Sequence, residues 1–264
     1  MTQNSHDFKY YSEKVKTDGY CVIPKVFSEK TIDAWSKAFT PLLHTYIASG
    51  GSELQRGPSR YYVTLPFEGL FADPDIFEND LILDTLELLV GKDFVMCQLA
   101  TDTPLLGSDY QEIHRDAPPL FPETEMETPA FQLALYFPLV DVTLDNGPVE
   151  IAAGTHMLPK AEAMALLESG KAKLEPIVMA RGDVMIRDVR GLHRGTPNQT
   201  NVPRPMAVIG YSRKWLLRPE VSIDIPRSTY SALSARARHM LRFNPIVEQV
   251  RFEPRRESYD TFAY

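Results

Sequence analysis

The sequence predicts a mainly β domain with flanking helices, arranged as a double-stranded β-helix of the jelly-roll, cupin-like kind. Three observations favour this fold class. About eight short segments, seven of them between residues 94 and 213, have the composition of strands and are separated by turn residues. Segments with helical spacing precede and follow this stretch, and one helical segment interrupts it. The 264 residues suffice for one large core, so we expect a single domain over 1–264 with its centre at about 90–215.

The residues before the predicted sheet favour helices and one strand. A short helix over Phe8–Lys16 should end near Gly19, and Tyr20–Ile23 has the composition of a strand. Ser28 is a favourable cap for a longer helix, whose apolar residues recur at helical spacing. These residues are Ile32, Trp35, Phe39, Leu42 and Tyr46. Pro41 should kink or break this helix, because proline lacks the amide hydrogen that a helix uses.

Two more segments lie between the long helix and the sheet. Gly50–Gly51 should end the helix, and the polar, turn-rich Gln55–Arg60 should form a mobile loop. A further helix is expected over Phe77–Leu89, with a buried stripe of leucines and a stop at Gly91. This helix should support one face of the sheet.

From Asp93 onward the spacing of apolar residues becomes strand-like. The expected strands are Phe94–Thr101, a segment around His114, Ala130–Val140, Val149–Ala152, Glu175–Met179, Asp183–Arg187 and Pro205–Arg213. Lys160–Ser169 should form the helix that interrupts them, and Ser228–Phe243 the helical end of the chain. The arginines of this last segment form a basic face that we expect to be solvated.

Composition limits the function classes. The formal charge of −7 and the pI near 5.4 argue against nucleic-acid binding, which uses clustered Lys and Arg, and favour a small-molecule substrate. No apolar run reaches the roughly 20 residues of a membrane span, and the first residues lack an apolar signal segment, so we expect a cytoplasmic protein. Cys21 and Cys97 fit buried free thiols in a reducing compartment. None of these features indicates an oligomeric state.

His114 and Asp116 form a His-x-Asp pair, and two such residues project from the same face of a strand. The imidazole and the carboxylate can then bind one metal ion. A neutral imidazole from another strand, for which His193 is the candidate, would complete the two-His, one-carboxylate triad that leaves open positions on Fe(II). A single His or Asp is more often a structural polar group. The metal-site prediction therefore depends on the combination.

The combination of these three residues with Arg204, eleven positions after His193 (204 − 193), resembles the phytanoyl-CoA dioxygenase-like branch of the iron- and 2-oxoglutarate-dependent oxygenases. Three further pieces are similar to the same family: Asp145–Pro148, Ala153–His156 and Arg181–Val184. The resemblance implies Fe(II) held by His114, Asp116 and His193, with 2-oxoglutarate and dioxygen as co-substrates. It also places Arg204 on the distal carboxylate of 2-oxoglutarate, which suits a planar guanidinium that can donate two parallel hydrogen bonds.

Other residues are weaker candidates for the site. Thr196 could donate its hydroxyl to the same carboxylate, although the family commonly has Ser two positions after the distal His, where this chain has Gly195. Gln132 could face the pocket or, equally, an outer face. His156 is a fourth possible ligand, but a histidine in such a turn more often fixes the loop through hydrogen bonds. Three arginines could meet an anionic substrate or be solvated or salt-bridged: Arg187, Arg190 and Arg213.

Ala117–Glu123 is rich in proline and directly follows Asp116, and an acidic segment continues from it to Thr128. Such an insertion is either an ordinary surface loop or an active-site lid, and its position favours the lid. We expect the segments Gln55–Pro66 and Ala117–Thr128 to determine substrate specificity.

The resemblance implies an oxygenase that hydroxylates or otherwise oxidises a C–H bond of a small molecule and releases succinate and CO2. A specialised-metabolite intermediate of a natural-product pathway is the favoured substrate class. The carboxylate of Asp116 favours hydroxylation or another oxidation over halogenation, because halide binds where a small apolar residue replaces that ligand. The main alternative is a metal-dependent cupin-type dioxygenase or isomerase that does not use 2-oxoglutarate. A decayed barrel that only binds a small ligand is a third hypothesis.

Overall fold

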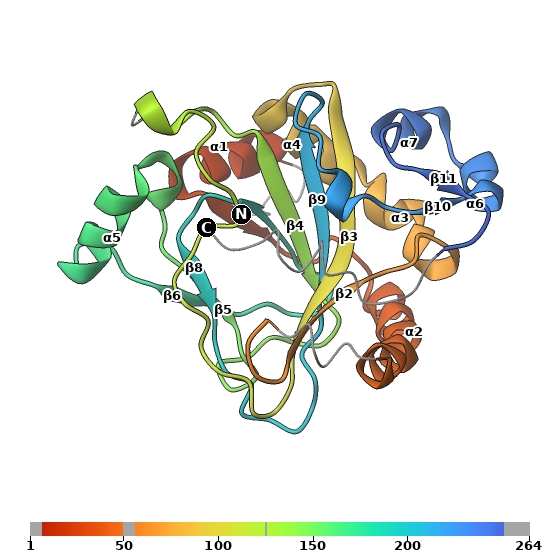
Figure 1. Ribbon diagram of the computed structural model, residues 1–264, viewed down its shortest axis with the longest axis horizontal. Coiled ribbons are helices and arrows are strands. Elements are labelled where there is room, and N and C mark those ends of the chain that lie inside the picture. The colour runs from red at the N-terminus through yellow and green to blue at the C-terminus, as the bar shows by residue number, and fades with distance from the viewer. Residues whose placement is uncertain (1–6, 50–55, 125, 251–264) are drawn as a thin grey trace.

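A six-stranded antiparallel sheet forms the centre of the computed structural model, which describes residues 7–49, 56–124 and 126–250 (Figure 1). The strand order is β1-β7-β4-β9-β3-β2, so strands that are distant in sequence are neighbours in the sheet. The bounds of these strands, in that order, are Tyr20–Ile23, Val184–Asp188, Gln132–Pro138, Met206–Arg213, Phe94–Pro104 and Arg60–Thr64.

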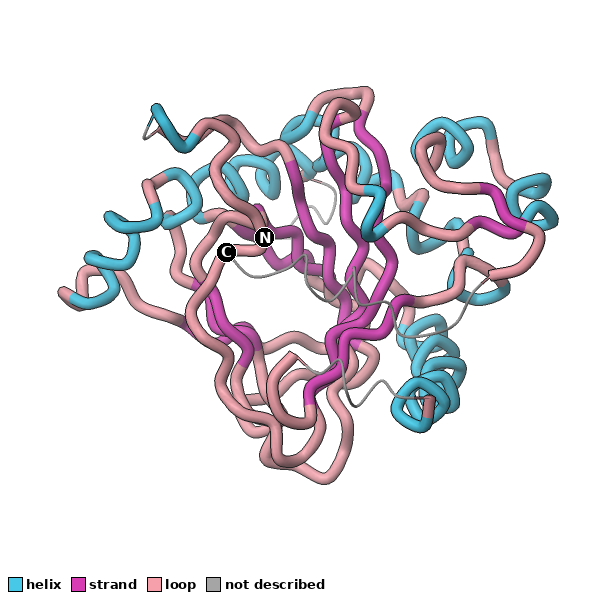
Figure 2. The backbone as a smooth tube through the Cα atoms, in the orientation of Figure 1, coloured by secondary structure: helices cyan, strands magenta, loops and turns pink. Residues whose placement is uncertain are grey.

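A smaller antiparallel sheet of order β6-β5-β8 faces the large one (Figure 2). Its strands are β6 Glu175–Ile177, β5 Val149–Ile151 and β8 His193–Gly195. Within the described ranges the two sheets do not join into a closed barrel. Two facing antiparallel sheets with helices around them confirm the predicted fold class, a mainly β domain of the jelly-roll kind.

The two faces of the large sheet have different chemical character, because successive residues of a strand point to opposite sides. On β4, one set of side chains belongs to the main hydrophobic core, together with residues of α2 Glu29–Ala48 and α4 Asp80–Val90: Leu133, Leu135 and Phe137. The other set lines a cavity between the sheets: Gln132, Ala134 and Tyr136. One face therefore stabilises the fold and the other is free for function.

The helices before the sheet begin and end largely where the sequence predicts. Gly19, at φ 84°, ends α1 Phe8–Asp18. Ser28 caps α2 by accepting a hydrogen bond from the Thr31 amide (3.0 Å). Pro41, however, does not break α2, which runs through it as one helix. The hydroxyl of Thr40 donates to the Ser36 carbonyl (3.0 Å), so a side chain adds a hydrogen bond in this turn.

Other helices differ in their bounds from the expectation. The helix expected over Phe77–Leu89 is α4, which begins three residues later, after Asn79 accepts a hydrogen bond from the Ile82 amide (3.3 Å). A short helix that was not expected, α3 Pro74–Phe77, precedes it. At the end of the chain, Ser234 caps a second short helix in the same way. The remaining elements are α5 Lys160–Glu168, α6 Arg227–Ala232, α7 Ala235–Met240, the parallel pair β10 Ile225–Pro226 and β11 Ile246–Val247, and the 3-10 helices η2 Gly69–Ala72, η3 Pro122–Thr124, η4 Thr155–Met157 and η5 Pro219–Val221.

Two expectations for the centre of the chain are wrong in detail. The segment around His114 is not a strand but a single β-bridge to His193. The loop expected over Gln55–Arg60 ends in β2, whose first residue is Arg60, while Gly50–Gly51 and Gln55 lie outside the described residues. In the described part of the chain, no helix combines the length and the apolar character needed to cross a membrane.

Candidate metal centre and cavity

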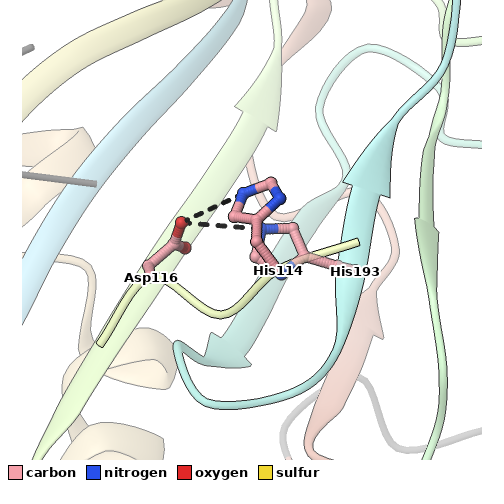
Figure 3. A group of neighbouring side chains, drawn as sticks. All are labelled: His114, Asp116 and His193. Atoms are coloured by element: carbon pink, nitrogen blue, oxygen red, sulfur yellow. Dashed lines mark ion pairs between the residues drawn. The ribbon is translucent and has the colours of Figure 1, made fainter. Parts of the chain in front are cut away.

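The structure brings His114, Asp116 and His193 together, with one ligand atom of each within 4.8 Å of the others. Oδ1 of Asp116 lies 3.6 Å from Nε2 of each histidine. The two imidazole rings are 4.3 Å apart between centroids. Figure 3 shows both rings next to the carboxylate, with dashed lines from the carboxylate to each ring. Two imidazole nitrogens and one carboxylate oxygen at one point are the donor set of a facial triad.

Main-chain hydrogen bonds hold the three residues in place. The amide of His114 donates to the His193 carbonyl (3.0 Å), and the amide of His193 donates back to the His114 carbonyl (3.1 Å). The Asp116 amide donates to the Val189 carbonyl (2.9 Å). His193 belongs to β8 of the small sheet, and Val189 directly follows β7 of the large sheet, so these bonds tie the triad to both sheets.

The second nitrogen of each imidazole has its own backbone partner. Nδ1 of His114 lies 2.7 Å from the Glu112 carbonyl, and Nδ1 of His193 lies 3.0 Å from the Gly191 carbonyl. A carbonyl oxygen only accepts, so the contact of His114 favours the tautomer with the proton on Nδ1. Nε2 of His114 then carries the lone pair that a metal needs. Nδ1 of His193 has both this acceptor and a donor, Nη1 of Arg187, within reach, so its contacts favour neither tautomer.

Arg187 of β7 lies behind the triad and is fully buried. Its Nη2 forms an ion pair with Oδ2 of Asp116 and donates to the hydroxyl of Tyr136 (2.6 Å). Its Nη1 is 3.1 Å from Nδ1 of His193. Of the roles expected for Arg187, namely solvated, salt-bridged or bound to an anionic substrate, the structure shows the salt bridge. Oδ2 is thus held by the protein, and Oδ1 remains directed at the histidines.

Burial and charge set the protonation states at the centre. Burial and the neighbouring His193 lower the pKa of His114 to about 4, so this imidazole is neutral at pH 7. Burial alone would raise the pKa of Asp116, but the charge of Arg187 and the two imidazoles hold that pKa well below its ordinary value. A neutral imidazole and an ionised carboxylate are the forms that bind a metal.

Arg204 lines the same cavity and is only 2% exposed. Its Nη2 donates to the Gly147 carbonyl (2.5 Å) and lies 3.8 Å from Oδ2 of Asp102. Its Nε has no hydrogen-bond partner within the described part of the chain. Burial lowers the pKa of Arg204 to about 10, although Asp102 opposes the shift. A buried guanidinium with an unsatisfied donor is a suitable place for an anion.

The residues present therefore fit both groups that the sequence analysis implied. The triad offers two nitrogens and one oxygen to a divalent transition metal and leaves the cavity side of such an ion open. Arg204 offers a cationic donor elsewhere on the cavity wall. The empty space between the lining atoms amounts to about 750 Å³, including space at the open mouth of the cavity.

The weaker candidates have separate outcomes. Gln132 lines the cavity, and its Oε1 accepts a hydrogen bond from Nη1 of Arg218 (2.8 Å). Thr196 is not among the lining residues, and its hydroxyl donates instead to the Pro148 carbonyl (2.7 Å). His156 lies away from the triad, and its Nε2 contacts the Lys16 carbonyl (3.1 Å). This contact fits the expected role of His156 in fixing a loop.

Several cavity residues carried no recognisable motif and were not singled out individually. They come from the loop before β2, from β2 and β3, and from the segment before His114, and they are Arg56, Arg60, Tyr62, Gln98, Asp102 and Gln111. The first three lie within Gln55–Pro66, one of the segments expected to determine specificity. The alternation of β2 and β3 would have placed the strand residues on one face, but only once the pairing of these strands was known.

The segment after Asp116 is anchored at its far end by buried charges. The side chain of Glu127 is 3% exposed and bonds Nη1 of Arg115 (2.8 Å) and Nη1 of Arg190 (3.0 Å). Arg190 also pairs with Asp188 (2.7 Å). Arg115 lies between His114 and Asp116 in the sequence, so one of the residues that hold the loop is also the neighbour of two candidate metal ligands. The acidic end of the expected lid is therefore not a solvated tail.

Comparison with protein families yields one match. The family model for phytanoyl-CoA dioxygenase (PhyH) matches residues 15–206. That range spans β1 to the first residue of β9 and includes all three triad residues and Arg204.

Solved structures share this fold. AviO1 from Streptomyces viridochromogenes Tue57 aligns with a TM-score of 0.62 and 20% identity over 82% of this chain and 99% of its own. SnoN, described as a non-heme alpha ketoglutarate dependent epimerase from nogalamycin biosynthesis, has a TM-score of 0.58 and 19% identity over 78% of this chain and 82% of its own. EctD from S. alaskensis, described with bound Fe, has a TM-score of 0.57 and 17% identity over 81% of this chain and 79% of its own.

Proposed function

The chain belongs to the phytanoyl-CoA dioxygenase family, and on that premise we propose that it is an Fe(II)- and 2-oxoglutarate-dependent oxygenase acting on a small molecule. The observation that carries the proposal is the convergence of His114, Asp116 and His193 in a cavity that Arg204 also lines. SnoN and EctD, which share the fold, are described with alpha ketoglutarate dependence and with bound Fe respectively, and this supports the same cofactors here.

In the proposed enzyme His114, Asp116 and His193 hold Fe(II), and Arg204 binds the distal carboxylate of 2-oxoglutarate. When bound, the iron and 2-oxoglutarate supply oxidation by dioxygen, with release of succinate and CO2. Arg187 keeps Asp116 ionised and fixes its second oxygen, so that one oxygen faces the metal. The apolar walls near the centre, such as Val149, exclude water from the reacting groups.

We propose hydroxylation or a related C–H oxidation as the outcome. Asp116 supplies the carboxylate ligand, and a bound carboxylate leaves no vacated position for a halide. A specialised-metabolite intermediate is the proposed substrate class, because SnoN is described as a protein of nogalamycin biosynthesis. The net charge of −7 and the absence of a long basic run do not suit a polyphosphate ligand.

An anaerobic titration tests the proposal. Fe(II) and 2-oxoglutarate together should produce a weak visible charge-transfer band that neither produces alone. Arg204→Ala should raise the KM for 2-oxoglutarate by at least tenfold, because a charge-assisted hydrogen bond is worth roughly 1.5–3 kcal/mol. The KM of Arg204→Lys for 2-oxoglutarate should lie between those of the wild type and Arg204→Ala, since lysine keeps the charge but not the paired donors. Arg236→Ala, on an exposed helix, is the control and should match the wild type.

Two results would contradict this function. Absence of the band with both components present would exclude a shared centre. Substrate conversion that needs no 2-oxoglutarate, and that Arg204→Ala leaves largely intact, would favour the alternative, a metal-dependent cupin that uses the triad without 2-oxoglutarate. A succinate-release screen over a metabolite panel, with mass spectrometry of the products, then identifies the substrate.

A further inference from the structure

We propose that Arg60 is a second anchor for the distal carboxylate of 2-oxoglutarate and that Gly195 exists to make room for it. The inference rests on the proposed function, since it concerns the same co-substrate. It adds a residue for which the sequence offered no motif, and it explains why residue 195 carries no side chain. The candidate for an additional donor in the sequence was Thr196, but its hydroxyl donates to the Pro148 carbonyl.

Arg60 is a buried cation on the cavity wall. It is the first residue of β2 and is 2% exposed. Nη1 pairs with Oδ2 of Asp102 (3.0 Å) and lies 3.4 Å from Oε1 of Gln111, and Nη2 donates to the Thr196 carbonyl (2.8 Å). Its Nε has no hydrogen-bond partner among the described residues. Three contacts thus fix the guanidinium, and the buried N–H of Nε is left without a partner among the described residues.

Arg60 and Arg204 both lie next to Pro104, and both side chains line the cavity. Arg60 is the register partner of Pro104 at the end of β3, and the amide of Arg204 donates to the Pro104 carbonyl (3.2 Å). Both guanidinium groups pair with the same carboxylate, Asp102, at 3.0 Å and 3.8 Å. The two cations therefore belong to one cluster at one end of the cavity.

The charge of this cluster matches one further anion. Arg60 and Arg204 contribute two positive charges and Asp102 one negative charge, so the cluster carries a net charge of +1. An unbalanced charge in a buried site is unfavourable, and one carboxylate would balance it. Both arginines also retain an unsatisfied Nε donor, in the described part of the chain, that could bond such a carboxylate. Charge and hydrogen-bond capacity indicate the same ligand group.

A side chain at position 195 has no space, whereas the backbone conformation there does not require glycine. Its φ lies outside the left-handed region that favours glycine, so another residue could adopt it. A Cβ at this position would lie 2.5 Å from Nη2 of Arg60 and closer still to Nη1 and Cζ. Real carbon atoms do not approach so closely. Any side chain at 195 would therefore displace the guanidinium of Arg60 from this position.

The test measures binding of 2-oxoglutarate by calorimetry in protein loaded with Mn(II), so no turnover is needed. Arg60→Ala should raise the Kd of 2-oxoglutarate roughly 10- to 100-fold, as expected for a lost charge-assisted hydrogen bond. The probe for comparison is 2-oxopentanoate, which has the same chain length but no distal carboxylate. Its Kd should change less than threefold, because it has nothing for Arg60 to bind.

A double-mutant cycle tests whether the side chains at positions 60 and 195 compete for the same space. Gly195→Ser alone should weaken 2-oxoglutarate binding, because the serine and the guanidinium compete for one volume. Arg60→Ala with Gly195→Ser should bind more tightly than the two single effects predict by addition, since the serine then fits and offers a hydroxyl. Arg236→Ala is again the control, and melting temperatures show that each variant is folded.

The outcomes separate this inference from the proposed function. If wild-type protein does not bind 2-oxoglutarate, the proposed function fails. If wild type binds it and Arg60→Ala binds it equally well, only the role of Arg60 fails. An equal loss for 2-oxoglutarate and 2-oxopentanoate would show that Arg60 merely supports the Thr196 segment, and an additive double mutant would overturn the spatial exchange with Gly195.

Discussion

At the scale of single residues, disturbing the charge balance at Asp116 should measurably lower the free energy of unfolding. Replacing Arg187 with Met leaves a buried carboxylate without its guanidinium, which should reduce the free energy of unfolding of the metal-free protein by about 3–5 kcal/mol. Added Mn(II) should recover part of this loss, because the metal supplies positive charge to the same carboxylate. Urea unfolding with and without Mn(II) measures both quantities.

Arg181 provides the control for that experiment. It pairs with Asp33 (2.6 Å) and Asp141 (3.3 Å) but is about one-third exposed. Arg181→Met should therefore cost less than about 1 kcal/mol, with no dependence on Mn(II). Equal losses for the two variants, or a loss at Arg187 that ignores the metal, would contradict the role given to Arg187.

The lowered pKa of His114 predicts an acid-sensitive stability. Between pH 6.5 and about 4 the unfolded chain binds a proton at residue 114 that the folded chain does not. The free energy of unfolding should therefore fall as pH decreases through this window, by up to about 2 kcal/mol at pH 5. In metal-free protein, His114→Gln should show a shallower decline than wild type between pH 7 and 5 in urea unfolding. Parallel declines would contradict the assignment.

The sequence could identify the candidate triad and, through the family resemblance, Arg204, but not the contacts of Arg187 and Arg60. A His-x-Asp pair and a distant histidine form a pattern that is visible without a structure. Arg187 and Arg60 acquire their roles only through strand pairing, since Arg187 meets Asp116 across 71 positions and Arg60 meets Thr196 across 136. An arginine alone is most often a surface residue, so composition gave no reason to expect these two in the interior.

At the scale of elements, the anchor of the lid segment makes the next prediction. Glu127→Gln should destabilise the protein by about 3 kcal/mol, because it removes the acid that Arg115 and Arg190 share in a buried site. Hydrogen exchange should also increase in residues 117–131. Glu123→Gln, in the same segment but exposed, should change stability by less than about 0.5 kcal/mol. Similar effects from both variants would show that Glu127 does not anchor the segment.

Elements with local signals were predicted better than those formed by pairing. The caps at Ser28 and Gly19 are local, and α2 and α1 begin and end close to them. β8 has only three residues and His114 only a single bridge, so neither is long enough to show a strand period. At Pro41 a local signal was misleading. A kink or break was expected there, but α2 continues through Pro41, because tertiary packing of a long buried stripe outweighs one missing hydrogen bond.

At the scale of the whole molecule, the two proposed ligands should stabilise the fold together. Each ligand at 100 times its Kd adds about 2.7 kcal/mol. For a chain of this size that corresponds to a rise in Tm of roughly 5–10 °C. Mn(II) should raise Tm alone, and 2-oxoglutarate should add to it only when Mn(II) is present. Differential scanning calorimetry measures this, and EDTA should abolish both increments. A rise with 2-oxoglutarate in the absence of metal would contradict binding at a shared centre.

The overall architecture followed from the order of strand-like and helix-like segments, which the sequence displays directly. The strand order did not, because β1-β7-β4-β9-β3-β2 joins segments from across the chain. Which polar residues share the cavity depends on that order. The fold class was therefore predictable, and the full composition of the site required the structure.

The pairing of β1 with β7 also has a consequence for synthesis on the ribosome. Tyr20 pairs with Arg187, which is added 167 positions later (187 − 20). At about 5–20 residues per second the first strand waits roughly 8–30 s for its partner. During that interval Cys21 and Ile23, which are buried in the finished sheet, have no strand to lie beside. The nascent chain thus emerges with an edge that only its second half can cover, and until then its unpaired backbone groups are open to pairing with another chain.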